Sequence, residues 1–180
     1  LRPGRTVELV QATLAHAGRP VVLARAWLMA GYDTAAIAGG GLDRIPAPDE
    51  VQPIVASDVW PGGFIRSVDV RRREAEPGRA VAWVRSHVDL LIGEQVSDTA
   101  TTLGLIDITN GVTPRRPPTE VLFPNVDLTI HLLGAPTRGW LGTDTTVVYG
   151  ATGLGLTHSV LHDERGPFAV SAQTLTVRPR

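Results

Sequence analysis

Three polar residues stand out because each lies beside or inside an apolar segment. Asp107, Asn125 and Gln173 occur in the stretches LGLIDITNG, LFPNVDLTIHLL and SAQTLTVRP. A carboxylate or an amide in such a position is costly unless it finds hydrogen-bonding partners. If the fold brings the three side chains together, they could hold a water molecule or a substrate carbonyl group.

Two other polar pairs have simpler explanations. His158 and His162 have the spacing of zinc ligands on a helix, but their segment has the pattern of a strand, where residues four apart are roughly 13 Å apart. We therefore expect both imidazoles to face solvent. Asp127 and His131 are likewise spaced along a strand. They are expected to form an exposed or interface polar face and not a catalytic dyad.

The composition excludes several classes of protein. The chain has 180 residues, of which 43% are hydrophobic, and this suits one or two compact domains. The net charge of -1 lacks the basic excess of a nucleic-acid binder. No cysteine is present, so disulfides, thiolate nucleophiles and cysteine-based metal sites are excluded. No apolar run is long enough for a membrane span and no signal peptide is visible, so a cytoplasmic location is expected.

The elements that must position the trio follow from hydrophobic periodicity. Residues 6–14 and 21–29 predict a β-hairpin, and 31–63 read as a linker because of GGG and four prolines. Residues 97–108 predict one helix, capped by Ser97 and ended by the Asn-Gly pair at 110–111. Further strands are predicted over 64–73, 80–92, 121–133, 144–150, 154–162 and 167–177. This order predicts an antiparallel α+β fold with a single helix covered by one curved sheet.

The same segments resemble a known family, the type II acyl-CoA thioesterases. Its chains hold two tandem hotdog units, in each of which an antiparallel sheet wraps around one long helix. The segments that look like its actinobacterial members are LRPGRTVELVQATL, WPGGFIRS, LIDITNGV, FPNVDLTIHL and LHDERGPFAVSAQTLTVRP.

The resemblance implies a division of the chain. Residues 1–30 would be the closing hairpin of a first, truncated hotdog unit, 31–63 the inter-unit linker, and 64–180 a complete second unit. The chain starts at Leu1, and its only methionine is Met29. We therefore expect the N-terminal part of the first unit to be missing. A homo-oligomer is expected as well, and the missing segment could be a separate chain.

The resemblance also implies an activity in fatty acid metabolism, the hydrolysis of fatty acyl-CoA. In the family an Asp, a Thr or other small polar residue, and a Gln activate a water molecule. Asp107 and Gln173 match the first and last of these, and Asn125 stands where many members carry Thr. No cofactor and no metal ion are implied. Five arginines could contact coenzyme A phosphates, although a solvated charge run is the more common explanation. They are Arg71, Arg72, Arg73, Arg115 and Arg116.

Two alternatives compete with this interpretation. An enoyl-CoA hydratase of the same fold would pair the Asp with a His a few residues later, and no His follows Asp107 before Val112. A non-catalytic acyl-CoA-binding or regulatory module is the second alternative, because hotdog sites often form between two units. Binding of acyl-CoA without release of a free thiol would distinguish it.

Overall fold

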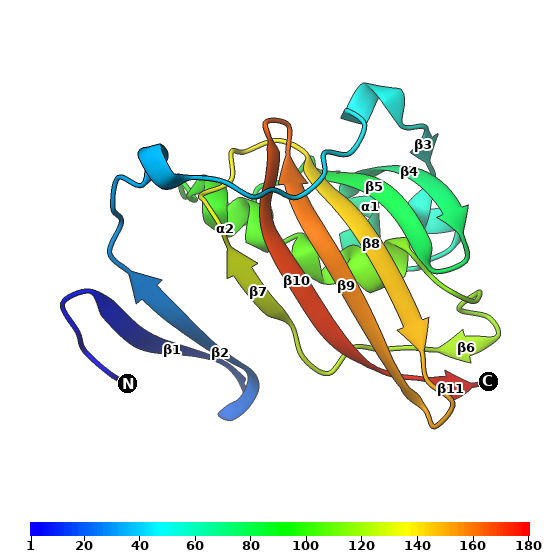
Figure 1. Cartoon of the computed structure of the whole chain (residues 1–180). Helices are drawn as coiled ribbons and strands as arrows, with labels where there is room; N and C mark the ends of the chain where they lie inside the picture. The colour runs from blue at the N-terminus through cyan, green and yellow to red at the C-terminus, as the bar shows by residue number, and fades with distance from the viewer. The chain divides into compact units, whose positions relative to one another are not determined.

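The N-terminal part of the protein is a β-hairpin. The computed structural model describes residues 1–180 and divides into two compact units, Leu1–Gly41 and Leu42–Arg180. In the first, strands β1 (Val7–His16) and β2 (Arg19–Met29) pair antiparallel, followed by the short helix η1 (Ala35–Ile37) (Figure 1). Ala17 and Gly18 form the turn with φ of 48° and 76°, which matches the twist of a hairpin. The predicted hairpin is confirmed.

The second unit is built on a seven-stranded antiparallel sheet. Its strand order is β3-β4-β5-β8-β9-β10-β7. The strands are β3 (Pro53–Ile54), β4 (Val68–Glu76), β5 (Arg79–Ser86), β7 (Thr129–Leu132), β8 (Leu141–Tyr149), β9 (Leu154–Asp163) and β10 (Gly166–Thr176). A separate two-stranded sheet joins β6 (Val121–Leu122) to β11 (Arg178–Pro179). Figure 1 shows β8, β9 and β10 as long neighbouring ribbons.

The helical segment that crosses this sheet is divided into three shorter pieces, where one continuous helix was predicted. It consists of α2 (Asp98–Leu103), the 3-10 turn η4 (Ile106–Ile108) and α3 (Thr109–Val112). The expectation of one long helix is therefore wrong. A run with three threonines and Gly104 has weak helix propensity, and α2 ends directly before this glycine. Ser97 caps α2 as predicted, since its hydroxyl accepts from the Ala100 N–H at 3.2 Å.

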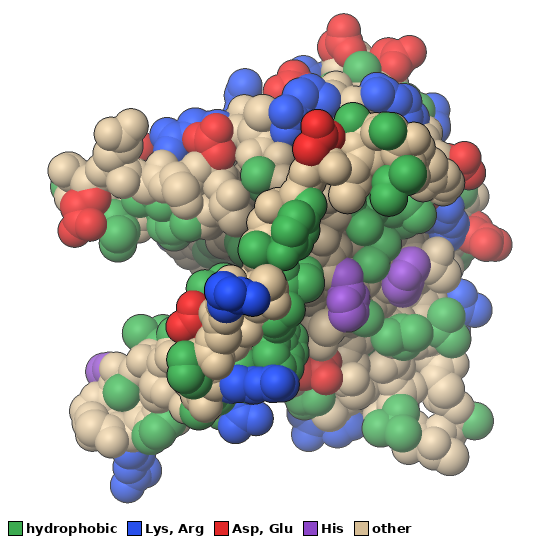
Figure 2. All heavy atoms as spheres, turned by 60° about the vertical axis from the view of Figure 1, so that its left-hand side comes forward, with side chains coloured by type: hydrophobic (Ala, Val, Ile, Leu, Met, Phe, Trp, Pro, Cys, Tyr) green, Lys and Arg blue, Asp and Glu red, His purple; other side chains and the backbone are tan.

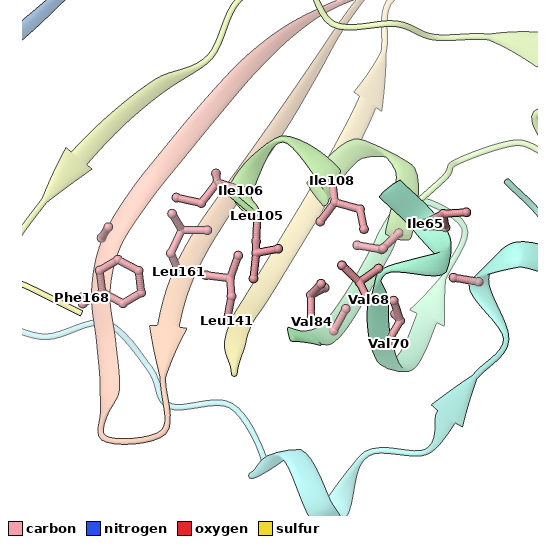
Figure 3. Packing of buried hydrophobic residues seen from close by; sticks show 14 residues of the cluster. Ile65, Val68, Val70, Val84, Leu105, Ile106, Ile108, Leu141, Leu161 and Phe168 are labelled. Carbon is pink, nitrogen blue, oxygen red and sulfur yellow. The ribbon is translucent and has the colours of Figure 1, made fainter. Parts of the chain in front are cut away.

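The core lies between this helical segment and one face of the sheet. Leu105 and Ile106 point from the helical segment toward Leu141 and Leu161 of the sheet, and Ile108 lies on the side of Ile65 (Figure 3). Ile106, Leu141 and Leu161 have no exposed surface. Three apolar residues within four positions, Leu105, Ile106 and Ile108, are thus buried around the 3-10 turn. Their burial fixes η4 against β8 and β9.

Three predicted strands have different bounds in the structure. Residues 63–66 form the helix α1 (Gly63–Arg66), so the strand predicted over 64–73 begins at Val68. The strand predicted over 80–92 ends at Ser86, and the apolar residues after it are exposed, with Ile92 at 98%. Figure 2 shows in green that hydrophobic side chains reach the surface on the face that it presents. Residues 121–133 contain β6 and β7, which belong to different sheets.

The segment interpreted as a linker contains regular structure. Besides η1 it holds η2 (Pro48–Glu50), β3 and η3 (Ala56–Asp58), and β3 pairs with β4. Residues 42–63 belong to the second compact unit. The division into a truncated first hotdog unit, a linker and a complete second unit stays a prediction.

Candidate functional site

The three predicted site residues come from three separate elements of the second unit. Asp107 lies in η4, Gln173 lies on β10, and Asn125 lies between β6 and β7. The stretch around Asn125 is held against β10 by backbone hydrogen bonds. The Val126 N–H donates to the Thr174 carbonyl, and the Thr176 N–H donates to the Pro124 carbonyl, each at 2.9 Å.

A carboxylate adds a further clamp on this stretch. Asp127 accepts hydrogen bonds from the Thr174 N–H at 2.7 Å and from the Thr174 hydroxyl at 3.2 Å. Asp127 therefore has a positioning contact with β10, and the polar face predicted for it is exposed. Residues 123–128 belong to no strand, apart from an isolated bridge between Asn125 and Leu175, and the Asn125 side chain reaches η4.

The structure brings the three side chains into direct contact. Asn125 Nδ2 donates to Oδ1 of Asp107 at 2.7 Å. Gln173 Nε2 donates to the same oxygen at 3.1 Å and to the Asp107 backbone carbonyl at 3.3 Å. Two amides thus converge on a single carboxylate oxygen.

The two oxygens of the Asp107 carboxylate differ in their surroundings. Oδ1 accepts both amide hydrogen bonds, whereas Oδ2 accepts none from the protein. The Asp107 side chain is exposed, Asn125 is half-buried, and Gln173 has only 1% of its surface exposed. The carboxylate is therefore fixed from the protein side and open on the other. Such an arrangement can accept a proton from a water molecule at Oδ2.

A fourth polar residue in this network was missed from the sequence. Thr109, the first residue of α3, donates its hydroxyl to Gln173 Oε1 at 2.8 Å and is completely buried. Its position two residues after Asp107 was the available signal. In a continuous helix, residues two apart point to nearly opposite sides and share few contacts, so the pattern did not connect them.

A cavity of about 630 Å³ lies beside Asp107. Its volume falls within the range of small-molecule sites, which is roughly 300–1,000 Å³. Apart from Asp107, its side chains are mostly apolar or aromatic, and they include Trp60, Phe64, Ile65, Ile108, Val121, Leu122 and Phe123. Trp60 is anchored by an indole N–H that donates to the Gly111 carbonyl at 2.9 Å, and its ring meets Phe123 edge to face.

The other candidate residues do not converge on a site. His158 is exposed as expected, but His162 is 1% exposed, and its Nε2 lies 3.0 Å from the Asp43 carbonyl oxygen. The expectation that His162 faces solvent is therefore wrong, because residues near Asp43 cover this part of the outer sheet face. No group of three or more His, Cys, Asp or Glu side chains is arranged to hold a metal ion.

The arginines are distributed over several local contacts. Arg71 packs over the Trp140 ring at 5.5 Å, Arg72 pairs with Glu74 at 2.6 Å, and Arg116 lies 4.0 Å from Glu120. Arg115 donates to the Pro77 carbonyl at 3.3 Å. These contacts are those of a solvated charged surface, and a phosphate-binding role for it stays a prediction.

Comparisons with known proteins agree with this architecture. A family model described as the acyl-CoA thioesterase C-terminal domain matches residues 48–177. A hot dog fold protein of unknown function from Alicyclobacillus acidocaldarius is 17% identical, with a TM-score of 0.74, and the match covers 99% of this chain and 70% of that one. A search of curated proteins gives no significant match.

Two further structures are similar over nearly the whole chain. One, provisionally assigned as a thioesterase II from Thermobifida fusca, is 26% identical with a TM-score of 0.68, covering 99% of this chain and 70% of that one. The other, acyl-CoA thioesterase II TesB2 from Mycobacterium marinum, is 16% identical with a TM-score of 0.66, covering 99% and 71%. The predicted hotdog fold is confirmed, with the shorter helix described above. None of the helices combines the length and apolar character that a membrane crossing requires.

Proposed function

Because the chain belongs to the family of the acyl-CoA thioesterase C-terminal domain, we propose that it hydrolyses fatty acyl-CoA to a free fatty acid and coenzyme A. The observation that carries this proposal is the Asp107 carboxylate, clamped through Oδ1 by Asn125 and Gln173 and open at Oδ2 beside an apolar cavity. This constellation suits a general base for a water molecule better than a nucleophile.

In the proposed reaction, Asp107 Oδ2 accepts a proton from a water molecule as its oxygen attacks the thioester carbonyl carbon. The tetrahedral intermediate then collapses, the carbon–sulfur bond breaks, and the proton on Asp107 passes to the leaving thiolate. The products are a fatty acid and the coenzyme A thiol. Asp107 returns to its ionised form, so no covalent enzyme intermediate and no cofactor are required.

The two amides orient the carboxylate in this proposal. Gln173 Nε2 contacts both Oδ1 and the backbone carbonyl of Asp107, and Asn125 Nδ2 contacts Oδ1 and, at 3.4 Å, the Asp127 carbonyl. An NH2 group has two hydrogens, and each of these two amide nitrogens has two acceptors in the protein, so all of their donors are used. They therefore hold Asp107, and Asp107 in turn holds the water.

The apolar cavity is the proposed site of the acyl chain. Trp60, Phe64 and Phe123 provide aromatic surface on its wall. Transfer of each methylene from water to such a surface contributes about 0.8 kcal/mol. The cavity thus favours an acyl substrate over a polar one, and Asp107 on its wall is placed to act on the carbonyl end.

The test is thiol release from a panel of acyl-CoA substrates of increasing chain length. Since the protein contains no cysteine, a thiol-specific reagent reports released coenzyme A alone. The proposal expects catalytic release of thiol together with free fatty acid. Stoichiometric binding without thiol release would instead identify a non-catalytic acyl-CoA-binding module. Consumption of an enoyl-CoA without thiol release would identify a hydratase.

The first compact unit has a proposed role of its own. Its hairpin exposes apolar residues along β1 and β2, including Leu14, Val22, Leu23 and Trp27. An isolated two-stranded hairpin is marginally stable in water. We propose that it is the closing hairpin of a first hotdog unit, whose other strands would cover these residues. A cytoplasmic location and a homo-oligomer stay predictions.

A further inference from the structure

We infer that Thr109 is a positioning residue of this site, which holds Gln173 in the orientation that Asp107 requires. The inference rests on the proposed function, because it assigns a role within the same reaction. Thr109 does not line the cavity beside Asp107. It acts through Gln173.

The direction of the hydrogen bonds defines what Gln173 needs. Its Nε2 end donates to Asp107, so its Oε1 end must point away from Asp107 into the interior. If the amide were turned over, Oε1 would face two acceptors, Oδ1 and the backbone oxygen of Asp107. The interior end of the Gln173 amide must therefore accept a hydrogen bond, and Thr109 is the residue that donates it, at 2.8 Å.

One short helical segment provides both residues that bond to Gln173, Asp107 and Thr109. Asp107 lies in η4 and is exposed, while Thr109 opens α3 and is completely buried. Residues two apart in an α-helix are separated by about 200° around the axis, so the two side chains point to nearly opposite sides of the helical segment. Thr109 then contacts Gln173 from beneath, and Gln173 contacts Asp107 above.

No other hydroxyl takes over this role. Thr157 on β9 is directly opposite Gln173 in the strand register and is 1% exposed. Its hydroxyl nevertheless has no hydrogen-bonding partner in the protein. Thr109 and Thr157 are thus two buried threonines next to the same glutamine, of which one bonds to it. They provide a matched pair of substitutions.

The experiment compares Thr109→Val, Thr157→Val and Thr109→Ser. Valine has nearly the shape of threonine but no hydroxyl, so Thr109→Val leaves Gln173 Oε1 buried without a donor. We expect kcat for thioester hydrolysis to fall about 10- to 100-fold in Thr109→Val, with KM changed less than about threefold. Thr109→Ser, which keeps the hydroxyl, restores kcat, and Thr157→Val leaves it unchanged.

A double-mutant cycle tests whether Thr109 affects kcat through Gln173. In a Gln173→Met background, Thr109→Val is expected to have no further effect on kcat, because the residue through which it acts is gone. Equal loss in both backgrounds, or a Thr109→Val enzyme that keeps its kcat, overturns the inference. A general loss of folding would lower activity in the Gln173→Met background too, so the cycle also excludes that explanation.

A second readout separates this inference from the proposed function. The side-chain NH2 signals of Gln173 in NMR spectra report its hydrogen bonding without any turnover. We expect them to exchange faster with solvent in Thr109→Val and to be unchanged in Thr157→Val. If the wild-type protein releases no thiol, the proposed function fails. The NMR measurement still shows whether Thr109 holds the Gln173 side chain. Unaltered Gln173 signals in Thr109→Val overturn the inference.

Discussion

Asn125 and Asp107 are joined by a hydrogen bond of 2.7 Å from Nδ2 to Oδ1. The donor is in an irregular stretch between two short strands, and the acceptor is in a 3-10 turn, so this contact depends on both irregular segments. The hydrogen bond connects the residues around Asn125, which bond to β10, to the exposed carboxylate of Asp107.

Substitution of Asn125 tests this bond. Asn125→Ala removes the donor at a half-buried position, and we expect kcat for acyl-CoA hydrolysis to fall about 10- to 100-fold. Asn125→Thr keeps a hydroxyl donor, as the family resemblance suggests, and should retain more activity than the alanine variant. Steady-state kinetics of the two variants decide the matter. Equal activity in Asn125→Ala and the wild type would remove Asn125 from the site.

Gln173→Glu should reveal the electrostatics of the network. It places a second carboxylate, buried, within hydrogen-bonding distance of Asp107, and like charges at this separation repel strongly. We expect the free energy of unfolding to fall by about 3 kcal/mol near neutral pH. The deficit should shrink as the pH falls, because protonation of either carboxyl removes the repulsion.

Urea denaturation near neutral pH and about two pH units lower measures this change. The matched control is Gln52→Glu, which makes the same substitution at an exposed position. It should change the stability little at either pH. A Gln173→Glu protein with a pH-independent deficit would show that the two side chains do not interact in solution.

Trp60 is expected to control both stability and the shape of the cavity. Trp60→Ala removes the indole that bonds to Gly111 and packs on Phe123, at a cost of about 3 kcal/mol in unfolding free energy. The enlarged cavity should move the preference in kcat/KM toward bulkier acyl chains. Trp60→Phe keeps the ring but not the N–H, so it separates the two effects. An unchanged acyl preference in Trp60→Ala would place the acyl chain elsewhere.

Asp163 predicts a pH dependence of stability outside the candidate site. Burial alone would raise the pKa of this carboxyl, but hydrogen bonds from Arg165 and Thr137 outweigh it and lower the pKa to about 2. The folded state therefore favours the charged form relative to an unfolded Asp, whose pKa is about 3.9. The resulting stabilisation, about 2–3 kcal/mol, is complete above the unfolded pKa and is lost as the pH falls toward 2.

Thermal unfolding of Asp163→Asn across this pH range provides the check. The variant should be less stable than the wild type near neutral pH, and the difference should disappear in acid. The exposed Asp49→Asn serves as a control for the loss of one negative charge. A constant difference between Asp163→Asn and the wild type at all pH values would contradict the assignment of the low pKa to Asp163.

Long strands with one buried face were predictable from the sequence. The segments predicted over 144–150, 154–162 and 167–177 nearly match β8, β9 and β10, because the turn sequences ATG and DERG separate them clearly. The convergence of Asp107, Asn125 and Gln173 was predictable only through the family resemblance. Their contacts join residues up to 66 positions apart, and no local pattern specifies such pairings.

The remaining features depend on tertiary contacts. The strand predicted over 121–133 is divided into β6, an isolated bridge from Asn125 to Leu175, and β7, which pair antiparallel with β11 and β10. The interruption before β7 coincides with Asp127, whose side chain accepts the Thr174 N–H. The helix predicted to stop at the Asn-Gly pair continues to Val112, where Trp60 bonds to Gly111 and Asn110 Nδ2 donates to the Phe123 carbonyl at 3.3 Å. Thr109 was not singled out from the sequence, since its partner Gln173 is 64 positions away.

The central claim is that Asp107 is the base for the attacking water, and Asp107→Asn tests it most directly. Asparagine still offers an oxygen to Asn125 and Gln173 but accepts no proton at pH values where enzymes work. The measurement is kcat for thiol release from acyl-CoA, with folding verified by circular dichroism and with the exposed Asp89→Asn as the control. We predict a loss of about 100-fold or more in Asp107→Asn and none in Asp89→Asn. Undiminished hydrolysis by a folded Asp107→Asn protein would contradict the claim.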